Sequence, residues 1–181
     1  DEAIGIDALV EHLLALGHRR MAFLGTNSPA NRRRGELLQK ILAARGSPAT
    51  LQIFHLHIEP TEAGHAGFQE VLKGPAETRP TAILAATDSM AHGALRCAAT
   101  LGIRVPKEVS ISGIDDIPSA RLAIPSITTI RQPMQAIAQA AFDCLMGKRP
   151  AGTGEILIRP DLFIRESTGP VPQSTLKQAR R

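Results

Sequence analysis

The stretch that most constrains the fold covers residues 80–118, where the sequence predicts a strand, a helix and a second strand. Residues 81–86 and 109–114 are short apolar runs, which are typical of strands that a sheet buries on both faces. Between them, apolar residues recur at helical spacing from Met90 onward, and Gly102 is suited to end such a helix. This order of elements predicts an α/β fold with an open, parallel sheet.

Polar side chains follow both of these predicted strands. Thr87 and Asp88 come directly after the first strand, and Asp115 and Asp116 come at the end of the second. Parallel strands end at the same edge of a sheet, and open α/β sheets bind their ligands at that edge. We therefore expect a binding site here. The structural alternative for Asp115 is a carboxylate that accepts hydrogen bonds from loop N–H groups.

The rest of the chain continues the alternation of helices and strands. Amphipathic spacing and turn residues predict further helices over residues 1–16, 32–45, 61–73 and 134–145, with a helical turn over 119–123. Short apolar runs predict strands over residues 21–24, 51–58 and 126–130, and two short strands within 155–166.

Several short motifs occur in a fixed order along the chain. They are His12-Leu13, Gly17-His18-Arg19-Arg20, Arg32 with Gly35, Thr87-Asp88, Met90-Ala91, Val105-Pro106, Ile114-Asp115-Asp116, Thr128-Thr129, Gln132-Pro133 and Arg165-Glu166-Ser167-Thr168. In this order they resemble the effector-binding core of the lactose-repressor (LacI/GalR) family of bacterial transcription regulators. The resemblance covers nearly the whole chain, as far as about Thr168.

The resemblance implies an architecture. Members of this family have a DNA-binding helix-turn-helix head, a hinge helix and two α/β subdomains of periplasmic-binding-protein type around an effector cleft. Nothing in this sequence resembles the head, so the chain is expected to be the C-terminal, effector-binding part. Residues 18–124 and 154–166 would form the C-terminal subdomain, and residues 1–17 and 125–150 would be pieces of the N-terminal one. Residues 167–181 are expected to be a disordered, basic tail.

The same resemblance implies which residues bind the effector. Asp115 matches an aspartate that accepts hydrogen bonds from the ligand, and Arg32 matches an arginine whose guanidinium suits hydroxyl, carboxylate or phosphate groups. Glu62 stands where many members place an aromatic ring, and the chain has no Trp or Tyr. These departures favour a small polar effector such as a sugar, a sugar acid or a sugar phosphate. The expected ligand-binding residues are Ser28, Arg32, Glu62, Thr87, Asp115 and Met134.

The net charge of +4 does not indicate a nucleic-acid-binding surface. Lys177, Arg180 and Arg181 lie in the tail with no acidic residue, so the remaining body is nearly neutral and lacks the basic face that DNA binding requires. We expect operator DNA to be a partner only through a head that this chain lacks.

Composition also restricts the compartment and the cofactors. No apolar run is long enough to span a membrane, and the first residues lack the pattern of a secretory signal. Cys97 and Cys144 fall on apolar helix faces and are expected to be reduced thiols in a cytoplasmic protein. His55 and His57 lie on the same face of a predicted strand, but a metal site needs three or four converging ligands, so no metal and no cofactor are expected.

Two other functions remain open, and an oligomer is expected. Asp88, Asp115 and Asp116 would suit an enzyme that holds a metal ion and a phosphate, although no nucleophile and base have an interpretable spacing. A solute-binding protein of a sugar uptake system would share the two-subdomain fold. The resemblance also implies a homodimer through the C-terminal subdomain. The predicted helix from Met90 to Leu101 offers more apolar surface than packing on one sheet face needs, which favours such an association.

Overall fold

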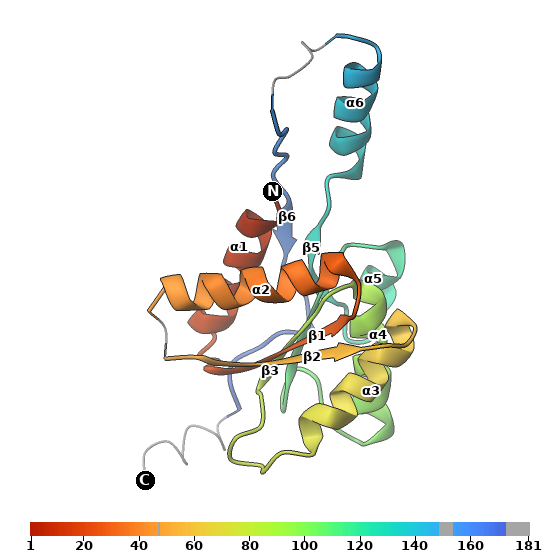
Figure 1. Cartoon of the computed structure of the whole chain (residues 1–181). Helices are drawn as coiled ribbons and strands as arrows, with labels where there is room; N and C mark the ends of the chain where they lie inside the picture. Colours follow the sequence, from red (N-terminus) through yellow and green to blue (C-terminus); the bar gives the residue numbers. More distant parts are fainter. Residues whose placement is uncertain (47, 149–153, 173–181) are drawn as a thin grey trace.

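The sheet of this protein is open and mostly parallel, as the sequence predicts. The computed structural model describes residues 1–46, 48–148 and 154–172. Within these ranges the strands form one sheet of order β2-β1-β3-β4-β5-β6, in which β1 to β5 are parallel and β6 is antiparallel to β5 (Figure 1). The strands are β1 (Arg20–Thr26), β2 (Thr50–Leu56), β3 (Ala82–Ala85), β4 (Ser110–Asp115), β5 (Thr128–Arg131) and β6 (Asp161–Phe163).

Helices cover both faces of the sheet. α1 (Glu2–Ala15) and α2 (Pro29–Ala44) pack together on one face, and α3 (Pro60–Leu72) and α4 (Asp88–Thr100) pack together on the other (Figure 1). The short α5 (Pro118–Leu122) follows β4. Because both faces are covered, every residue of β3 is buried, which explains why this strand is a continuous apolar run without alternation. None of the described helices is both long and apolar enough to cross a bilayer.

Some element boundaries differ from the expected ones. α2 and α3 begin at Pro29 and Pro60, a little before the positions expected from the apolar spacing. Proline suits the first position of a helix because its fixed φ is helical and the N–H that it lacks would have no partner there. Of the two strands expected within residues 155–166, the described chain forms one, β6.

α3 and α4 approach each other at two glycines. A Cβ atom at Gly64 would lie 1.9 Å from the carbonyl oxygen of Met90, and one at Gly93 would lie 1.9 Å from the carbonyl oxygen of Thr61. The two helices are therefore in backbone contact, and the apolar side of α4 is buried. The expectation that this helix keeps spare apolar surface for a dimer is wrong, because α3 of the same chain covers that surface.

The expected division into subdomains differs from the packing. Residues 1–17 contain α1, which packs on α2 and contributes to the same core as β1, β3 and β4. β5, within residues 125–150, is a strand of the same sheet and pairs with β4. α1 and β5 therefore belong to the same packed unit as the strands within residues 18–124, whereas α6, also within residues 125–150, does not pack on it. The apolar side chains that α1 buries are Ile6, Leu9, Val10 and Leu13.

α6 (Met134–Leu145) differs from the other helices. It projects away from the sheet (Figure 1), and none of its residues is buried. Its apolar residues are nevertheless spaced as on a packed helix, and Phe142 and Leu145 are 50% and 85% exposed. α6 is thus an amphipathic helix whose apolar face has little cover from the part of the chain that the structure describes.

The segment after β6 is fixed to the sheet and is not a disordered tail as far as residue 172. The Ser167 hydroxyl donates to the carbonyl oxygen of Ile111 at 2.5 Å and accepts from the N–H of Thr128 at 2.9 Å. Two residues later, Gly169 accepts from a ring nitrogen of the buried His18 at 2.9 Å. The remainder of the expected tail, residues 173–181, lies outside the described residues.

The contact between α3 and α4 gives a test of the packing. Gly93→Ala should lower the free energy of unfolding by about 3 kcal/mol, because the new methyl group meets a backbone carbonyl that cannot move without separating the helices. Gly74→Ala is the control, since the nearest atom to its new methyl group is a side-chain oxygen 4.0 Å away. Urea unfolding of both variants measures the effect. Equal stabilities would contradict the backbone contact.

Candidate functional site

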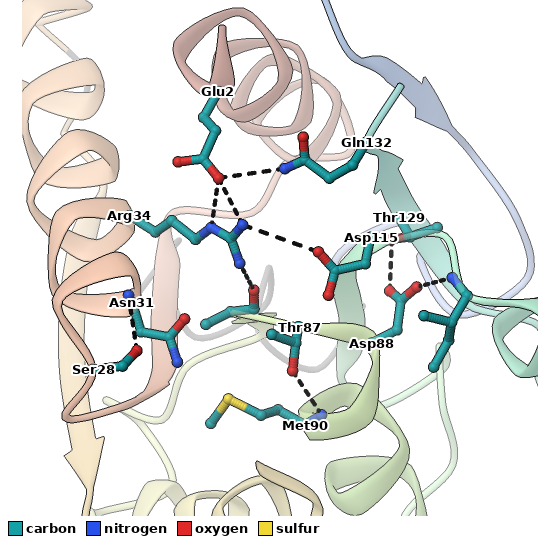
Figure 2. A network of polar contacts seen from close by, with 12 residues as sticks. Glu2, Ser28, Asn31, Arg34, Thr87, Asp88, Met90, Asp115, Thr129 and Gln132 are labelled. Atoms are coloured by element: carbon teal, nitrogen blue, oxygen red, sulfur yellow. Dashed lines mark hydrogen bonds and ion pairs between the residues drawn. The ribbon is translucent and has the colours of Figure 1, made fainter. Parts of the chain in front are cut away.

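Polar residues collect where β1, β3 and β4 end. These strands are parallel neighbours, so the loops after Thr26, Ala85 and Asp115 open at one edge of the sheet. Figure 2 shows this carboxyl edge, with side chains from α1, α2, α4 and the loops around them directed toward one another. The sequence predicts the site at this edge. We use the name rim cluster for four of these residues, Glu2, Arg34, Asp115 and Gln132.

A buried arginine joins the parts of the rim cluster. Arg34 of α2 donates through Nε and Nη2 to Glu2 Oε1 of α1, at 2.9 and 2.6 Å. Its Nη1 donates to the carbonyl oxygen of Ala86, directly after β3, at 2.7 Å. The same guanidinium lies 4.0 Å from Asp115 Oδ1, and Gln132 donates to Glu2 at 3.3 Å. One cation therefore links α1, α2, β3 and the end of β4 (Figure 2).

Asp115 combines an unusual backbone with an accessible carboxylate. Its φ is +118° and that of Asp116 is +55°, values that residues other than glycine seldom adopt. Such backbone conformations cluster at functional sites because the surrounding structure must hold them in place. The Asp115 side chain is 34% exposed. Burial raises the pKa of Asp115, and the Arg34 guanidinium partly offsets this effect.

Asp116 has a structural role. Its side chain is fully buried and accepts hydrogen bonds from Arg131 at 2.6 Å and from Arg165 at 2.5 Å. Burial alone would raise the pKa of Asp116, but these two guanidinium groups outweigh burial and hold the pKa below its ordinary value. Asp116 thereby attaches the loop after β4 to β5 and to the segment after β6.

Asp88, the first residue of α4, also has a carboxylate that is hydrogen-bonded to other residues of the chain. It is completely buried, and its Oδ1 accepts from the Thr129 hydroxyl at 2.6 Å while its Oδ2 accepts from the N–H of Ile117 at 2.9 Å. A Cβ atom at Gly113 would lie 2.2 Å from Oδ1, so only glycine fits there. Burial raises the pKa of Asp88 from 3.8 to about 6, against the opposing effect of the two hydrogen bonds.

Two of the expected ligand-binding residues cap helices at this edge. The Ser28 hydroxyl accepts from the N–H of Asn31 at the start of α2, and the Thr87 hydroxyl accepts from the N–H of Met90 at the start of α4, both at 3.3 Å. These bonds satisfy N–H groups that have no partner within the helix. Ser28 and Thr87 therefore lie at the carboxyl edge, as expected, and help to fix the loops that carry it.

The other expected residues are not joined to the rim cluster. Arg32 is exposed in the first turn of α2, and its guanidinium takes part in no hydrogen bond or ion pair among the described residues. Glu62 is exposed in the first turn of α3 and lines a shallow groove between α3 and α4. Met134, the first residue of α6, is 65% exposed. Their roles as ligand contacts stay predictions.

Sequence reasoning missed Arg34 and Glu2, and a signal existed for the first of them. Arg34 precedes the buried Leu38 and Leu42 by four and eight residues, so all three lie on one face of α2. Arg32 lies two positions away, on a different side of the helix. Spacing thus distinguishes the buried arginine from the exposed ones. No comparable signal identifies Glu2, because its partner comes from another helix.

The rim cluster offers a polar ligand an accessible carboxylate next to a guanidinium. A ligand hydroxyl or amine can donate to Asp115, and an anionic or hydroxyl group can accept from an arginine at the same edge. A metal–phosphate enzyme would need Asp88 and Asp116 free, but both carboxylates are buried and hydrogen-bonded. Within the described ranges, no three His, Cys, Asp or Glu side chains are grouped as metal ligands.

Asp88 gives a pH-dependent test. Because its pKa is higher in the fold than the ordinary 3.8, the folded chain binds the proton more tightly than the unfolded chain. The protonated form thus stabilises the fold below pH 3.8, and this contribution is lost as the pH rises through about 6. We therefore compare the free energy of unfolding of the parent with that of Asp88→Asn. As the pH rises between these two values, the parent's free energy minus that of the variant should decrease by up to about 3 kcal/mol. Urea unfolding across this range measures it, and a constant difference would refute the shift.

A family model and curated relatives match most of the chain. Residues 10–168 match the periplasmic binding protein-like domain. The HTH-type transcriptional regulator reg1 of Streptomyces lividans is 32% identical over 182 residues, which is 95% of this chain and 52% of that protein. The HTH-type transcriptional repressor PurR of Klebsiella pneumoniae is 32% identical over 168 residues, covering 89% and 48%. The chain thus spans about half the length of these relatives.

Solved structures agree with this result. A LacI transcriptional regulator from a Rhodococcus species superposes with a TM-score of 0.85 at 30% identity, over 95% of this chain and 64% of the other. A LacI-family regulator from Enterococcus faecium with bound ribose has a TM-score of 0.79 at 26% identity, over 94% of this chain and 64% of that one. A dimeric Lac repressor has a TM-score of 0.81 at 29% identity, over 94% of this chain and 62% of the repressor chain. The chain therefore belongs to the periplasmic binding protein-like domain family, and its resemblance to the LacI-type transcriptional regulators is confirmed.

Proposed function

We propose that this chain is the effector-binding part of a LacI-type transcriptional regulator, with the effector bound at the carboxyl edge of the sheet. The observation that carries the proposal is the Asp115 carboxylate, which is 34% exposed and lies 4.0 Å from the Arg34 guanidinium. Its positive φ shows that surrounding contacts hold it in a conformation that costs free energy. Open α/β sheets bind their ligands at this edge.

The effector is a small polar molecule such as a sugar, a sugar acid or a sugar phosphate. Asp115 suits ligand hydroxyl groups, and Arg32 and Arg34 suit carboxylate or phosphate oxygens. The chain has no Trp or Tyr, so the described half of the site has no such ring to stack on a sugar face. The ribose in the similar E. faecium regulator supports the class of ligand.

α6 supports the presence of a second half of the effector domain. Its apolar face has little cover from the described residues, and this chain spans about half of its relatives. In this proposal α6 packs on an N-terminal subdomain, which closes over the carboxyl edge and lies next to a DNA-binding head. The regulator then acts in the cytoplasm, contacts operator DNA through that head and catalyses no reaction. Curated relatives named as regulators support this choice over an enzyme.

The effector site is tested in the longer regulator that the proposal implies. Asp115→Ala should weaken the response of operator binding to the effector at least about tenfold, because it removes an acceptor of charge-assisted hydrogen bonds. Arg32→Ala should do the same without loss of stability, since no contact in the described chain depends on its guanidinium. DNA-binding titrations with and without a screened panel of sugars, sugar acids and sugar phosphates measure the response.

Glu77→Ala is the control for this experiment, because Glu77 is exposed in the loop before β3, at the other end of the strands. It should respond to the effector like the parent protein. Operator affinity without effector should stay within about twofold for all three variants. If Asp115→Ala and Arg32→Ala both respond like the control, the effector site lies elsewhere.

We also propose a homodimer through the body of the sheet domain. Leu122 at the end of α5 and the nearby Ile124 are 81% and 96% exposed, which is unusual for two large apolar side chains next to each other. The dimeric Lac repressor among the similar structures supports this assembly. α6 offers a competing apolar face, so the two surfaces must be tested separately.

Light scattering of single variants distinguishes the two surfaces. In this 181-residue chain, Ile124→Asp should convert a dimer to a monomer at micromolar concentration, because the new charge would be buried without a partner. Leu145→Asp, on the exposed face of α6, should leave the dimer intact and reduce only higher aggregates. A dimer that survives Ile124→Asp and dissociates with Leu145→Asp would assign the association to α6.

A further inference from the structure

A cavity lies at the amino edge of the sheet, at the opposite end of the strands from the rim cluster. Its volume is about 310 Å³, and it opens between the end of α3, the start of β3 and the loop before β4. The buried side chains of Phe68, Val71, Ile83 and Val109 form an apolar floor. The volume falls within the range of cavities that hold small molecules.

Two arginines at the mouth of this cavity have no carboxylate partner among the described residues. Arg20 Nε donates to the carbonyl oxygen of Arg79 at 2.9 Å, and Arg79 Nε donates to the carbonyl oxygen of Gly74 at 2.8 Å. These bonds hold both half-buried side chains at the cavity. Their terminal nitrogens form no hydrogen bond or ion pair in the part of the chain that the structure describes. Half-buried cations without a counter-charge favour an anionic partner.

Glu108, the acidic residue of the cavity lining, does not supply that counter-charge. Its Oε2 accepts from the Arg104 side chain at 2.7 Å and from the Arg104 N–H at 3.1 Å. The Glu108 carboxylate is thus paired with Arg104, which does not line the cavity. The mouth keeps the charge of two guanidinium groups above an apolar floor.

We propose that this cavity binds a small monocarboxylate with a compact apolar body, such as a branched-chain or aromatic acid. The carboxylate accepts from the terminal nitrogens of Arg20 and Arg79, an arrangement in which charge-assisted hydrogen bonds are strong. The apolar body occupies the space over Phe68 and Ile83 and leaves water, which is favourable in proportion to the apolar area buried. The regulator would then sense a second metabolite at a site separate from the effector cleft.

The chain's own C-terminal residues fit the cavity less well. Pro172 lines it, and residues 173–181 follow in the sequence. Their charged side chains are Lys177, Arg180 and Arg181, with no acidic one. Such a segment would add cations beside Arg20 and Arg79, which like-charge repulsion disfavours. A small anion has the complementary charge.

The proposal is tested with matched acids and amides. Isovalerate and benzoate should bind the 181-residue chain, and isovaleramide and benzamide should bind at least about tenfold more weakly, because they have the same shape and no charge. Ligand-observed NMR titration measures the dissociation constants. Equal affinity for acids and amides, or no binding of any of the four below about 10 mM, would overturn the proposal.

Three variants place the binding in this cavity. Arg79→Gln should weaken the binding of isovalerate and benzoate at least about tenfold. Ala76→Phe should also weaken the binding of both acids, because Ala76 is an exposed residue of the lining and a larger side chain there fills the mouth of the cavity. Lys107→Gln removes an exposed charge from the same edge outside the lining and should change affinity less than about twofold. Circular dichroism confirms that each variant is folded.

Two outcomes would overturn the site. If Ala76→Phe folds and binds the acids like the parent, the acids do not occupy this cavity. If binding appears only after residues 173–181 are deleted, the C-terminal segment is the occupant. Because these experiments use neither the ligands nor the residues of the effector test, the failure of one proposal leaves the other standing.

Discussion

The arrangement of the carboxyl edge depends on one buried carboxyl group, that of Asp88. It joins the start of α4 to the Thr129 hydroxyl of β5 and to the N–H of Ile117 in the loop after β4. Only a glycine at position 113 leaves room for it against β4. Three separate segments of the chain are thus fixed to one another near Asp115 (Figure 2). Because burial disfavours the charged form, the pKa of Asp88 rises to about 6. The group therefore holds the site in place and has no free oxygen with which to act in it.

Many of the motif residues that carry the family resemblance hold the fold together through buried hydrogen bonds. His18 is buried and bonds the Thr81 hydroxyl at 2.9 Å, at the amino end of the sheet. Arg165 binds the buried Asp116, and the Thr128 and Thr168 hydroxyls lie 2.8 Å apart. These bonds fix the chain after β6 against the sheet, which is why the motifs identify the architecture well and the effector poorly. In our proposal, specificity for the effector rests on the few exposed groups at the carboxyl edge, where the resemblance is weakest.

The central strand–helix–strand unit could be predicted because local signals agree with the tertiary structure. β3 and β4 are short apolar runs, α4 has a capping threonine, and parallel pairing places Asp115 at the edge where ligands bind. The position of α1 could not be predicted, because the resemblance alone assigned it to another subdomain and helical spacing does not reveal which sheet a helix covers. The importance of Arg34 was obscured by its two arginine neighbours, although its spacing to Leu38 indicated burial. Glu2 emerges only when α1 and α2 are placed side by side.

The most direct test of the account is hydrogen–deuterium exchange of the full-length regulator, with and without the sugar, sugar acid or sugar phosphate that most raises its melting temperature. If the effector binds at the carboxyl edge, bound ligand should slow exchange at residues 26–34, 86–90 and 114–117, which carry the loops after β1, β3 and β4. Residues 72–81 and 103–109, at the amino edge, should exchange as in the free protein. Slower exchange confined to the amino edge, with no change in the loops after these three strands, would contradict the assignment of the effector site.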